Sequence, residues 1–399
     1  MVAASAAKEV TAASGDLEFE LLCQAARPRP GLEQIRNSLK AGIDHRRLYD
    51  LAALHGVRLC LYQCFSSAAW NDVPPDARHE LEEFRRSHQA RSLLFASELK
   101  RLAVLFVAGG IPFISFKGPA LSFALYGDLA QREYNDLDIL VSREHVDDAQ
   151  RLLEDAGYRN RQGDRLFRRM FLSHQRQFRF DCEELATAVD LHWDLTSIGL
   201  PFPVTVDELL DSPQRLSLGN TVLSAPDDGE LARLLAGHGT KEGWLYLKWL
   251  RDFAVLVDGK RDLDWTKIHY AAERQHAGDT VLVACGMAQE VLGIPPPGSL
   301  ESPLRSSTRV RALVGELSRR LRRGEPASGR AGNLSDILLC QRKIDRILFM
   351  ALMAIHPTAS DHAALRLPEP LWPLYYVARP FRVGANLLAA RRRHPRQEP

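Results

Sequence analysis

Apolar residues recur at spacings of three and four in two long parts of the chain. The first part runs from residue 17 to 110, contains the stretch "RRLYDLAALHGVRLCLYQCF" and ends at Gly109 and Gly110. The second part runs from residue 227 to about 360. This spacing is that of an amphipathic α-helix, and glycine commonly ends helices. The pattern therefore predicts a helical N-terminal region, residues 17–110, and a helical C-terminal region, residues 227–360.

Between the two helical regions, short apolar runs rich in β-branched and aromatic residues are typical of strands. We expect strands at 111–116, 136–141, 165–172, 176–181, 187–195 and, as an edge strand, 221–225. One short helix is expected over 120–128, and another over 143–157 with Ser142 as its N-cap. This mixture predicts a core of residues 111–226 around a mixed sheet, and an α+β fold for the chain.

The two ends of the chain differ in composition from the rest. Residues 1–16 are rich in Ala and Ser and contain no apolar segment, which predicts disorder without a secretory signal. Residues 361–399 are rich in Pro and Arg and are expected to form a solvated tail. The longest clean apolar run, from Ile347 to Ile355, is shorter than the roughly 20 residues of a bilayer span. We therefore expect a cytoplasmic protein without a membrane span.

Composition restricts the classes of partner and cofactor. The chain has 399 residues, which is too many for one ordinary core, so two or three domains are expected. Its 52 basic and 50 acidic residues give a formal net charge of +2, so the sequence allows nucleic acid as a partner without favouring it. The six cysteines show no zinc-ligand spacing and are expected to be reduced, buried thiols.

Two aspartates interrupt the apolar run "DLDILV". In a strand, Asp136 and Asp138 point to the same face, roughly 6.6 Å apart at a rise of ~3.3 Å per residue. Leu137, Ile139 and Val141 then face the core. Two carboxylates this close repel each other unless a proton or a cation lies between them. Because oxygen ligands favour a hard divalent ion, the pair predicts a Mg²⁺ or Mn²⁺ site.

A third carboxylate for such a site is expected from a neighbouring strand. Asp190 lies in "TAVDLHWDL" as a lone acid between apolar residues. Asp194 shares its face by the same alternation but lies nearer the end of the strand, so Asp190 is preferred. Metal-dependent phosphoryl chemistry uses such acids to hold the ions that clamp the reacting oxygens. The sequence thus predicts a catalytic metal site of Asp136, Asp138 and Asp190.

The segment between the first two predicted strands favours phosphate binding. Lys117 and Gly118 lie between a predicted strand and the start of a helix, where backbone N–H groups and the helix dipole attract anions. Lys117 adds a positive charge, and Arg132 is suited to a bidentate phosphate contact. These three residues are our candidates for binding the phosphates of a nucleotide.

The segment "KGPALSFALYGDLAQREYNDLDILV" and the later "VDLHWDL" together resemble the bacterial uncharacterised nucleotidyltransferase family of the polymerase-β-like nucleotidyltransferase superfamily. The shared pattern is Lys-Gly, a tyrosine nine residues on, an arginine, and Asp-hydrophobic-Asp. The later stretches "HGTKEGW" and "WLRD" match His-x-x-Lys-x-x-Trp and Trp-hydrophobic-x-Asp motifs of that family. The resemblance covers about residues 95–295. Pro119 is a departure, because the wider superfamily has a serine there that contacts phosphate.

The resemblance implies a mixed nucleotidyltransferase sheet and transfer of NMP from an NTP to an acceptor, with release of pyrophosphate. Asp136 and Asp138 would bind both Mg²⁺ or Mn²⁺ ions, and Asp190 would hold the catalytic ion and help to activate the acceptor. Lys241 would be either a triphosphate contact or an ordinary helix-surface lysine. The acceptor is expected to be a small molecule or a peptide of a biosynthetic pathway, since genes of this family often lie near such pathways.

Several aromatic and histidine residues near these motifs have an ordinary structural interpretation. His192 and Trp193 are expected to pack beside the site, and His238 is expected to be structural. Tyr126 is expected to be a core residue, with stacking on the nucleotide base as the alternative.

Other functions stay open on the sequence alone. A non-catalytic descendant of the fold would bind a nucleotide or a peptide without turnover. A toxin-like enzyme would nucleotidylate tRNA or protein, for which the basic segment 318–323 offers a surface. A metal-dependent glycosyltransferase also uses an Asp-x-Asp motif, but its fold needs several strand–helix units before the motif, and one strand is expected there. Consumption of NTP with release of pyrophosphate distinguishes nucleotidyl transfer from sugar transfer.

Overall fold

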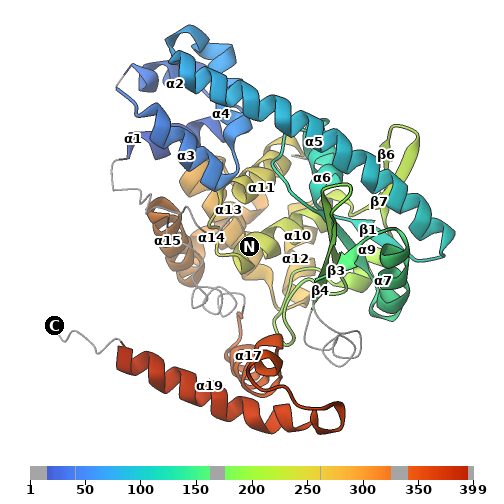
Figure 1. The fold of residues 1–399 in the computed structure, drawn as a ribbon. Helices are drawn as coiled ribbons and strands as arrows, with labels where there is room; N and C mark the ends of the chain where they lie inside the picture. Colours follow the sequence, from blue (N-terminus) through green and yellow to red (C-terminus); the bar gives the residue numbers. More distant parts are fainter. Residues whose placement is uncertain (1–15, 41, 162–175, 261, 325–339, 394–399) are drawn as a thin grey trace.

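The computed structural model describes residues 16–40, 42–161, 176–260, 262–324 and 340–393 (Figure 1). Apart from Asp16, the N-terminal segment expected to be disordered lies outside these ranges, as does the strand expected at 165–172. In the described residues the α+β architecture is confirmed, because a five-stranded mixed sheet is combined with many helices.

The N-terminal region is helical, as predicted, and contains α1 (Leu17–Ala25), α2 (Leu32–Leu39), α3 (His45–His55), α4 (Arg58–Ala68) and α5 (Pro75–Ala108). The carboxylates of Asp16 and Asp44 cap α1 and α3 by accepting hydrogen bonds from backbone N–H groups. Helix α5 is 34 residues long and passes from the other N-terminal helices to the sheet (Figure 1). Its Leu81 belongs to the helical core, whereas Phe95 and Phe106 belong to the core on the sheet.

The sheet has the strand order β1-β2-β5-β4-β3, with β1 (Phe113–Ser115), β2 (Leu137–Val141), β3 (Arg159–Asn160), β4 (Gln177–Cys182) and β5 (Thr187–His192). β2 and β5 run parallel, and the other neighbours are antiparallel. Side chains alternate as predicted, since Leu137, Ile139 and Val141 lie in the core that α5 covers. Leu140 points the other way, into a separate cluster with Ile114.

Two helices follow strands of the sheet. Helix α6 (Gly118–Tyr126) connects β1 to β2 and begins at Gly118, whose φ of 56° is adopted easily only by glycine. Helix α7 (Val146–Asp155) follows β2 after the 3₁₀ turn η2 (Arg143–His145). Because this turn lies between Ser142 and α7, Ser142 does not cap the α-helix; its hydroxyl is 2.7 Å from Nδ1 of His145.

Residues 221–225 form a strand, β7 (Thr221–Ala225), but the prediction that it is an edge of the main sheet is wrong. Within the described part of the chain, β7 pairs with β6 (Gln214–Leu218) in a separate two-stranded sheet. Gly219, with a φ of 62°, and Asn220 form the tight turn between them. β6 reads "QRLSL" and has only two apolar residues, so the apolar pattern did not predict it. The short helix α9 (Val206–Asp211) precedes this hairpin.

The C-terminal region contains α10 (Asp228–Lys241), α11 (Leu247–Gly259), α12 (Trp265–Arg274), α13 (Gly278–Leu292), α14 (Gly298–Ser306) and α15 (Thr308–Arg323). One hydrophobic cluster contains residues of both helical regions, such as Leu22 of α1 and Val281 of α13. Arg251 of α11 also donates hydrogen bonds to the backbone oxygens of Ala26 and Arg27. The two helical regions therefore share one core, although the sheet separates them in the sequence.

The last described elements are α17 (Lys343–Ile355), α18 (Ala359–Ala364), η3 (Glu369–Leu371) and α19 (Leu374–Arg393). Helices α17 and α19 pack together at one end of the molecule (Figure 1). Residues 361–393, expected to be part of a solvated tail, are thus largely helical, and α19 contains Pro380. Among the described residues, no helix combines the length and the apolar character that a membrane span requires.

Candidate active site

A cavity of about 360 Å³ lies beside β2 and β5, between the sheet and the start of α11. It is lined by Lys117, Arg132, Glu133, Tyr134, Asn135, Asp136, Asp138, Arg176, Gln177, Asp190, His192, His238, Lys241, Glu242, Lys248 and Trp249. Every candidate site residue from the sequence lies on this wall except Gly118, which starts α6. At Gly118 a Cβ atom would lie 3.1 Å from the backbone oxygen of Asp136, so the turn packs closely behind the acidic strand.

Asp138 and Asp190 lie side by side because they are direct partners in the parallel β2–β5 register. Asp138 is buried, and its Oδ1 lies 3.2 Å from Nζ of Lys117 and 3.0 Å from Nε2 of His192. Burial alone would raise the pKa of Asp138, but the Lys117 ammonium and the His192 hydrogen bond hold this pKa well below its usual value. Asp138 is therefore an anion at the centre of the cavity.

Asp190 differs from Asp138 in having little compensation for its charge. Gln177 donates to Oδ2 of Asp190 at 2.9 Å, whereas the buried Oδ1 has no hydrogen-bond partner among the described residues. Burial, followed by repulsion from Asp136 and Asp138, raises the pKa of Asp190 to about 7. A carboxyl group with this pKa is suited to accept a proton near neutral pH or to bind a cation.

Asp136 takes a different position from the one predicted. It precedes β2, its side chain is 32% exposed, and its Oδ2 lies 3.5 Å from Nη1 of Arg179. Burial and the charge of Asp138 raise its pKa. The group of side chains whose ligand atoms could hold one ion consists of Asp138, Asp190 and His192, without Asp136. The structure thus brings two of the three predicted acids together with a histidine.

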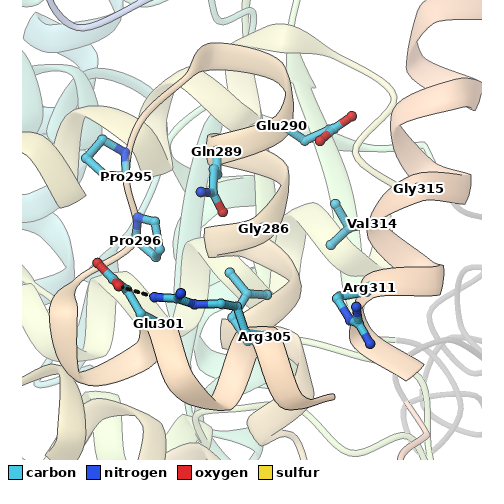
Figure 2. A pocket seen from close by; sticks show the side chains of 11 residues that line it. Gly286, Gln289, Glu290, Pro295, Pro296, Glu301, Arg305, Arg311, Val314 and Gly315 are labelled. Carbon is cyan, nitrogen blue, oxygen red and sulfur yellow. Dashed lines mark hydrogen bonds and ion pairs between the residues drawn. The ribbon is translucent and has the colours of Figure 1, made fainter. Parts of the chain in front are cut away.

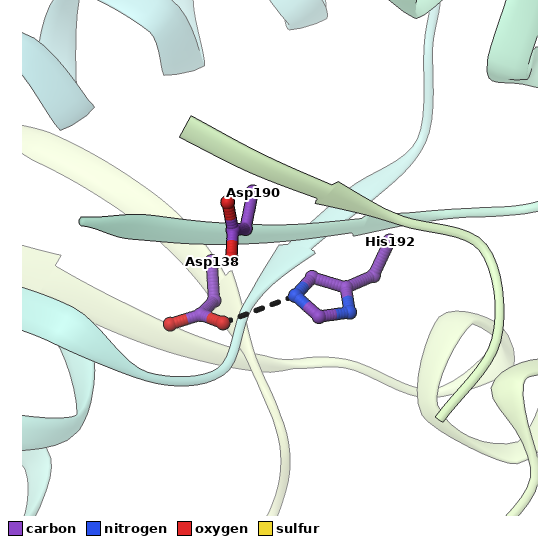
Figure 3. Close-up of side chains that lie close together, drawn as sticks. All are labelled: Asp138, Asp190 and His192. Carbon is purple, nitrogen blue, oxygen red and sulfur yellow. Dashed lines mark hydrogen bonds and ion pairs between the residues drawn. The ribbon is translucent and has the colours of Figure 1, made fainter. Parts of the chain in front are cut away.

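His192 completes this three-residue group (Figure 3). Its ligand atom and one oxygen of each aspartate all lie within 4.8 Å of one another. Burial lowers the pKa of His192 to about 4, so the ring is neutral at neutral pH. Because the Asp138 carboxylate only accepts hydrogen bonds, Nε2 carries the ring proton in this contact and would bind an ion only with the proton on Nδ1. As the second residue after Asp190, His192 faces the same side of β5, although a packing role was expected for it.

The three side chains fit a divalent metal ion. The buried Oδ1 of Asp190 accepts no hydrogen bond from the described residues and has only the Arg179 guanidinium nearby, at 3.6 Å. Two carboxylates with one imidazole are a common donor set for divalent ions. The imidazole changes the expected preference, because an all-oxygen site selects Mg²⁺ or Mn²⁺, whereas a nitrogen ligand also suits softer ions. We regard this group as a candidate divalent-metal site.

Arg132 is fixed by a buried carboxylate from the C-terminal region. Its Nε donates to Oδ2 of Asp252 at 2.7 Å, and the hydroxyl of Tyr126 donates to Oδ1 of Asp252 at 2.8 Å. Asp252 is 1% exposed. Tyr126 is half-buried and positions Asp252. It is not one of the described residues that line the cavity. The tyrosine, the arginine and the final aspartate of the sequence motifs form one hydrogen-bonded group.

The "HGTKEGW" stretch places three residues, His238, Lys241 and Glu242, at the cavity and Trp244 beneath it. His238 and Lys241 line the cavity from the end of α10, and Nζ of Lys241 donates to the backbone oxygen of Leu195 at 3.1 Å. Trp244 is fully buried, with its ring against Gly239, where a Cβ atom would approach it to 2.4 Å. Trp244 thus supports the helix end that carries His238 and Lys241.

The N-terminal region holds the loop before β2. Nη2 of Arg58 lies 2.6 Å from Oε2 of Glu133, and the Arg58 backbone N–H donates to Oε1 at 2.7 Å. Nε2 of His88 lies 2.9 Å from the backbone oxygen of Arg132. Two consecutive loop residues are therefore attached to helices α4 and α5, close to Asp136.

A larger cavity, of about 610 Å³, lies between α13, α14 and α15 (Figure 2). Its charged side chains include Glu301 and Arg305, which form an ion pair at 2.7 Å. This cavity contains none of the acid and histidine residues of the candidate metal site. The chemistry is therefore expected at the smaller cavity beside the sheet.

Comparison with protein families places these observations in context. Residues 41–293 match the model of a family described as uncharacterised nucleotidyltransferase. The match covers more than half of the chain and includes α3 to α5, the sheet and α10 to α13. It begins well before residue 95, where the resemblance was expected to start, and so includes Arg58 and His88. Among curated proteins, none matches the chain.

Proposed function

The chain belongs to the family of uncharacterised nucleotidyltransferases, and we propose that it transfers NMP from an NTP to an acceptor hydroxyl or phosphate, with release of pyrophosphate. The observation that carries this proposal is the alignment of Asp138 with Asp190 across β2 and β5, with Lys117 and His192 on either side. Paired carboxylates next to a cationic cavity wall are what binding of a metal–nucleotide complex requires.

In this proposal, Asp138, Asp190 and His192 hold a divalent ion, Mg²⁺ or Mn²⁺, in the cavity. When bound, the ion supplies positive charge to the phosphates and to the departing pyrophosphate. Asp136 completes the carboxylate set by exchanging its contact with Arg179 for a cation. Lys117 attracts the phosphates, as Arg132 and Lys241 do from the other walls.

The proposed reaction forms a bond between the acceptor oxygen and the α-phosphorus of the NTP. The bond from this phosphorus to the bridging oxygen breaks, and that oxygen leaves with pyrophosphate. Asp190 accepts the proton of an acceptor hydroxyl, as a carboxylate that lines the cavity beside Asp138. Most of the acceleration in such a reaction comes from positioning and electrostatic stabilisation.

A second candidate function is nucleotide binding without transfer. The observation that favours it is that the protein's own cations already face the three acids. Lys117 contacts Asp138, and Nη1 of Arg179 lies 3.5 Å from Asp136 and 3.6 Å from Asp190. A binding protein descended from an enzyme would keep such an arrangement, and turnover separates the two functions.

The proposed function can be tested by incubating the protein with each NTP labelled at the α-phosphate, with Mg²⁺ or Mn²⁺. Small alcohols, peptides, tRNA and protein are offered as acceptors in separate reactions, and a nucleotide-sugar is offered in parallel. Labelled acceptor together with free pyrophosphate supports nucleotidyl transfer, and the acceptor that carries label distinguishes a biosynthetic role from a toxin-like one. Calorimetric binding of NTP without label transfer to any acceptor would favour the binding protein.

A further inference from the structure

The cavity wall combines five cationic and five carboxylate side chains. Four of the cations donate to oxygen atoms of the protein: Lys117 to Asp138, Arg132 to Asp252, Arg176 to Ser197, and Lys241 to the backbone of Leu195. Lys248 is different, because its Nζ makes no hydrogen bond or ion pair with any described residue. Nζ of Lys248 lies over the ring of Tyr246, 6.0 Å from the ring centroid, which is a weak cation–π contact.

The position of Lys248 is fixed by the N-terminal region. Lys248 is the second residue of α11, and its stem lies against Gly56, the left-handed residue that ends α3. A Cβ atom at Gly56 would come within 2.7 Å of Cδ of Lys248, so a larger residue there would displace the lysine stem. The stem is therefore confined between two helices while the amine faces the cavity.

The surroundings of Lys248 favour an added anion. The side chain is half-buried, and burial, followed by the charge of Arg132, lowers the pKa of its amine. The carboxylates of Asp252, Glu133 and Asp136 oppose this shift from a distance, but none forms an ion pair with the amine in the described structure. Removing a charged amine from water without a partner costs free energy, and a phosphate oxygen would compensate this cost through a charge-assisted hydrogen bond.

We propose that Lys248 binds a phosphate oxygen of the nucleotide's triphosphate, because among the described cations lining the cavity it is the one whose side chain makes no hydrogen bond or ion pair. This inference rests on the proposed function and adds a residue for which neither sequence motifs nor the acidic strand pair provided a role. The other four cations donate hydrogen bonds to oxygen atoms of the protein. Lys248 therefore contributes more to phosphate affinity than any one of them.

The test measures binding of inorganic tripolyphosphate, in the presence of Mn²⁺, to the full chain by isothermal titration calorimetry. Lys248→Met keeps the length of the stem and removes the charge. Lys260→Met is the matched control, since Lys260 ends the same helix, is paired with Asp228 at 2.9 Å and does not line the cavity. We expect Lys248→Met to weaken binding at least about tenfold, in the range of hydrogen bonds to charged groups, and Lys260→Met to weaken it less than twofold.

Lys248→Arg keeps a cation in the same place and is expected to restore most of the affinity. Equal weakening by Lys248→Met and Lys260→Met would overturn the proposal, because the effect would then be one of overall charge. Binding unchanged by Lys248→Met would overturn it as well, as would an unsubstituted protein that does not bind tripolyphosphate.

A second measurement uses the unsubstituted protein and does not depend on the folding of a variant. Acetylation of lysine amines is quantified by peptide mass spectrometry with and without tripolyphosphate and Mn²⁺. We expect the ligand to protect Lys248 at least about threefold and to leave Lys260 unprotected; equal protection, or none, would contradict the proposal.

The two proposals fail in different ways. If Lys248→Met weakens tripolyphosphate binding but the unsubstituted protein transfers no NMP, the phosphate site stands and the proposed function falls. If transfer occurs and neither the affinity nor the KM for NTP responds to Lys248→Met, the proposed function stands and the role of Lys248 is rejected.

Discussion

The two helical regions share a core but contribute to the cavity in different ways. The C-terminal region provides His238, Lys241, Lys248 and Trp249 as lining side chains. In the described structure, no residue of the N-terminal helices lines the cavity. Arg58 and His88 instead contact Glu133 and the backbone of Arg132, in the loop before β2. One region thus supplies the groups that face a ligand, and the other fixes where those groups lie.

This difference is clearest at two consecutive loop residues. Arg132 is held by Asp252 of α11, and Glu133 is held by Arg58 of α4. The loop that leads to Asp136 is therefore attached to both helical regions at once. Because buried and partly buried charges are costly without partners, each attachment stabilises one loop conformation. A substitution at the cavity should change chemistry alone, whereas one behind it should change stability and chemistry together.

The largest expected effect is on the cavity side of this comparison. Asp138→Asn removes the central carboxylate, which contacts Lys117 and His192, with little change of shape. We expect the rate of NMP transfer to fall by about 10³-fold, because several kcal/mol of charge stabilisation is lost. Circular dichroism should show a folded protein. Full activity of this variant would remove Asp138 from the catalytic group and leave the cavity without its central acid.

The pH dependence of metal binding tests the contribution of the sheet alone, because the titrating group, Asp190, lies in β5. Below pH 7 a proton competes for Asp190, whose pKa is about 7, so the affinity for Mn²⁺ should fall about tenfold per pH unit. Above pH 7 the affinity should level off. His192, with a pKa of about 4, stays neutral between pH 5 and 8.

Mn²⁺ affinity can be measured by calorimetry between pH 5 and 8. Asp190→Asn is the control, and its weaker binding should lose this dependence on pH. Binding that is equally tight at pH 5.5 and pH 8 would show that Asp190 is not a ligand.

The part of the site predicted from the sequence is the part determined by local alternation. Apolar neighbours identify the strands, and the period of two fixes the face, so the pairing of Asp138 with Asp190 follows once β2 and β5 are adjacent. The same alternation places His192 on the face of Asp190, but a histidine in a strand is most often an ordinary packing residue. The sequence therefore pointed to the two acids that the strand register pairs, and it gave no reason to group His192 with them.

The features that were missed depend on long-range contacts. Lys248 packs against Gly56, almost two hundred residues earlier in the chain, and no periodicity encodes that contact. The shared core of the two helical regions was missed for the same reason, since an apolar helix face does not specify its partner. The β6–β7 pairing was missed because β6 has few apolar residues, so local pattern alone does not identify it.

The smallest expected effect tests the supporting side of the comparison directly. Arg58→Met keeps an apolar stem but removes the guanidinium group, which holds Glu133, a residue only 8% exposed, and lies over the ring of Phe84. We expect the free energy of unfolding to fall by about 1–3 kcal/mol, because Glu133 loses a charged partner. Since the same loop carries Asp136, kcat/KM for NTP should also fall, by about tenfold. Both quantities can be measured by denaturant unfolding and steady-state kinetics.

The matched control is Arg46→Met in the same region, because Arg46 pairs with Asp50 and Glu80 on the surface and its side chain is 68% exposed. This variant should change neither stability nor kcat/KM appreciably, since exposed ion pairs contribute little. Arg58→Met with reduced stability but an unchanged kcat/KM would mean that the N-terminal helices hold the fold without positioning the loop. The two helical regions would then differ only in which of them touches the ligand, and the position of Asp136 would have to depend on the Arg132–Asp252 pair alone.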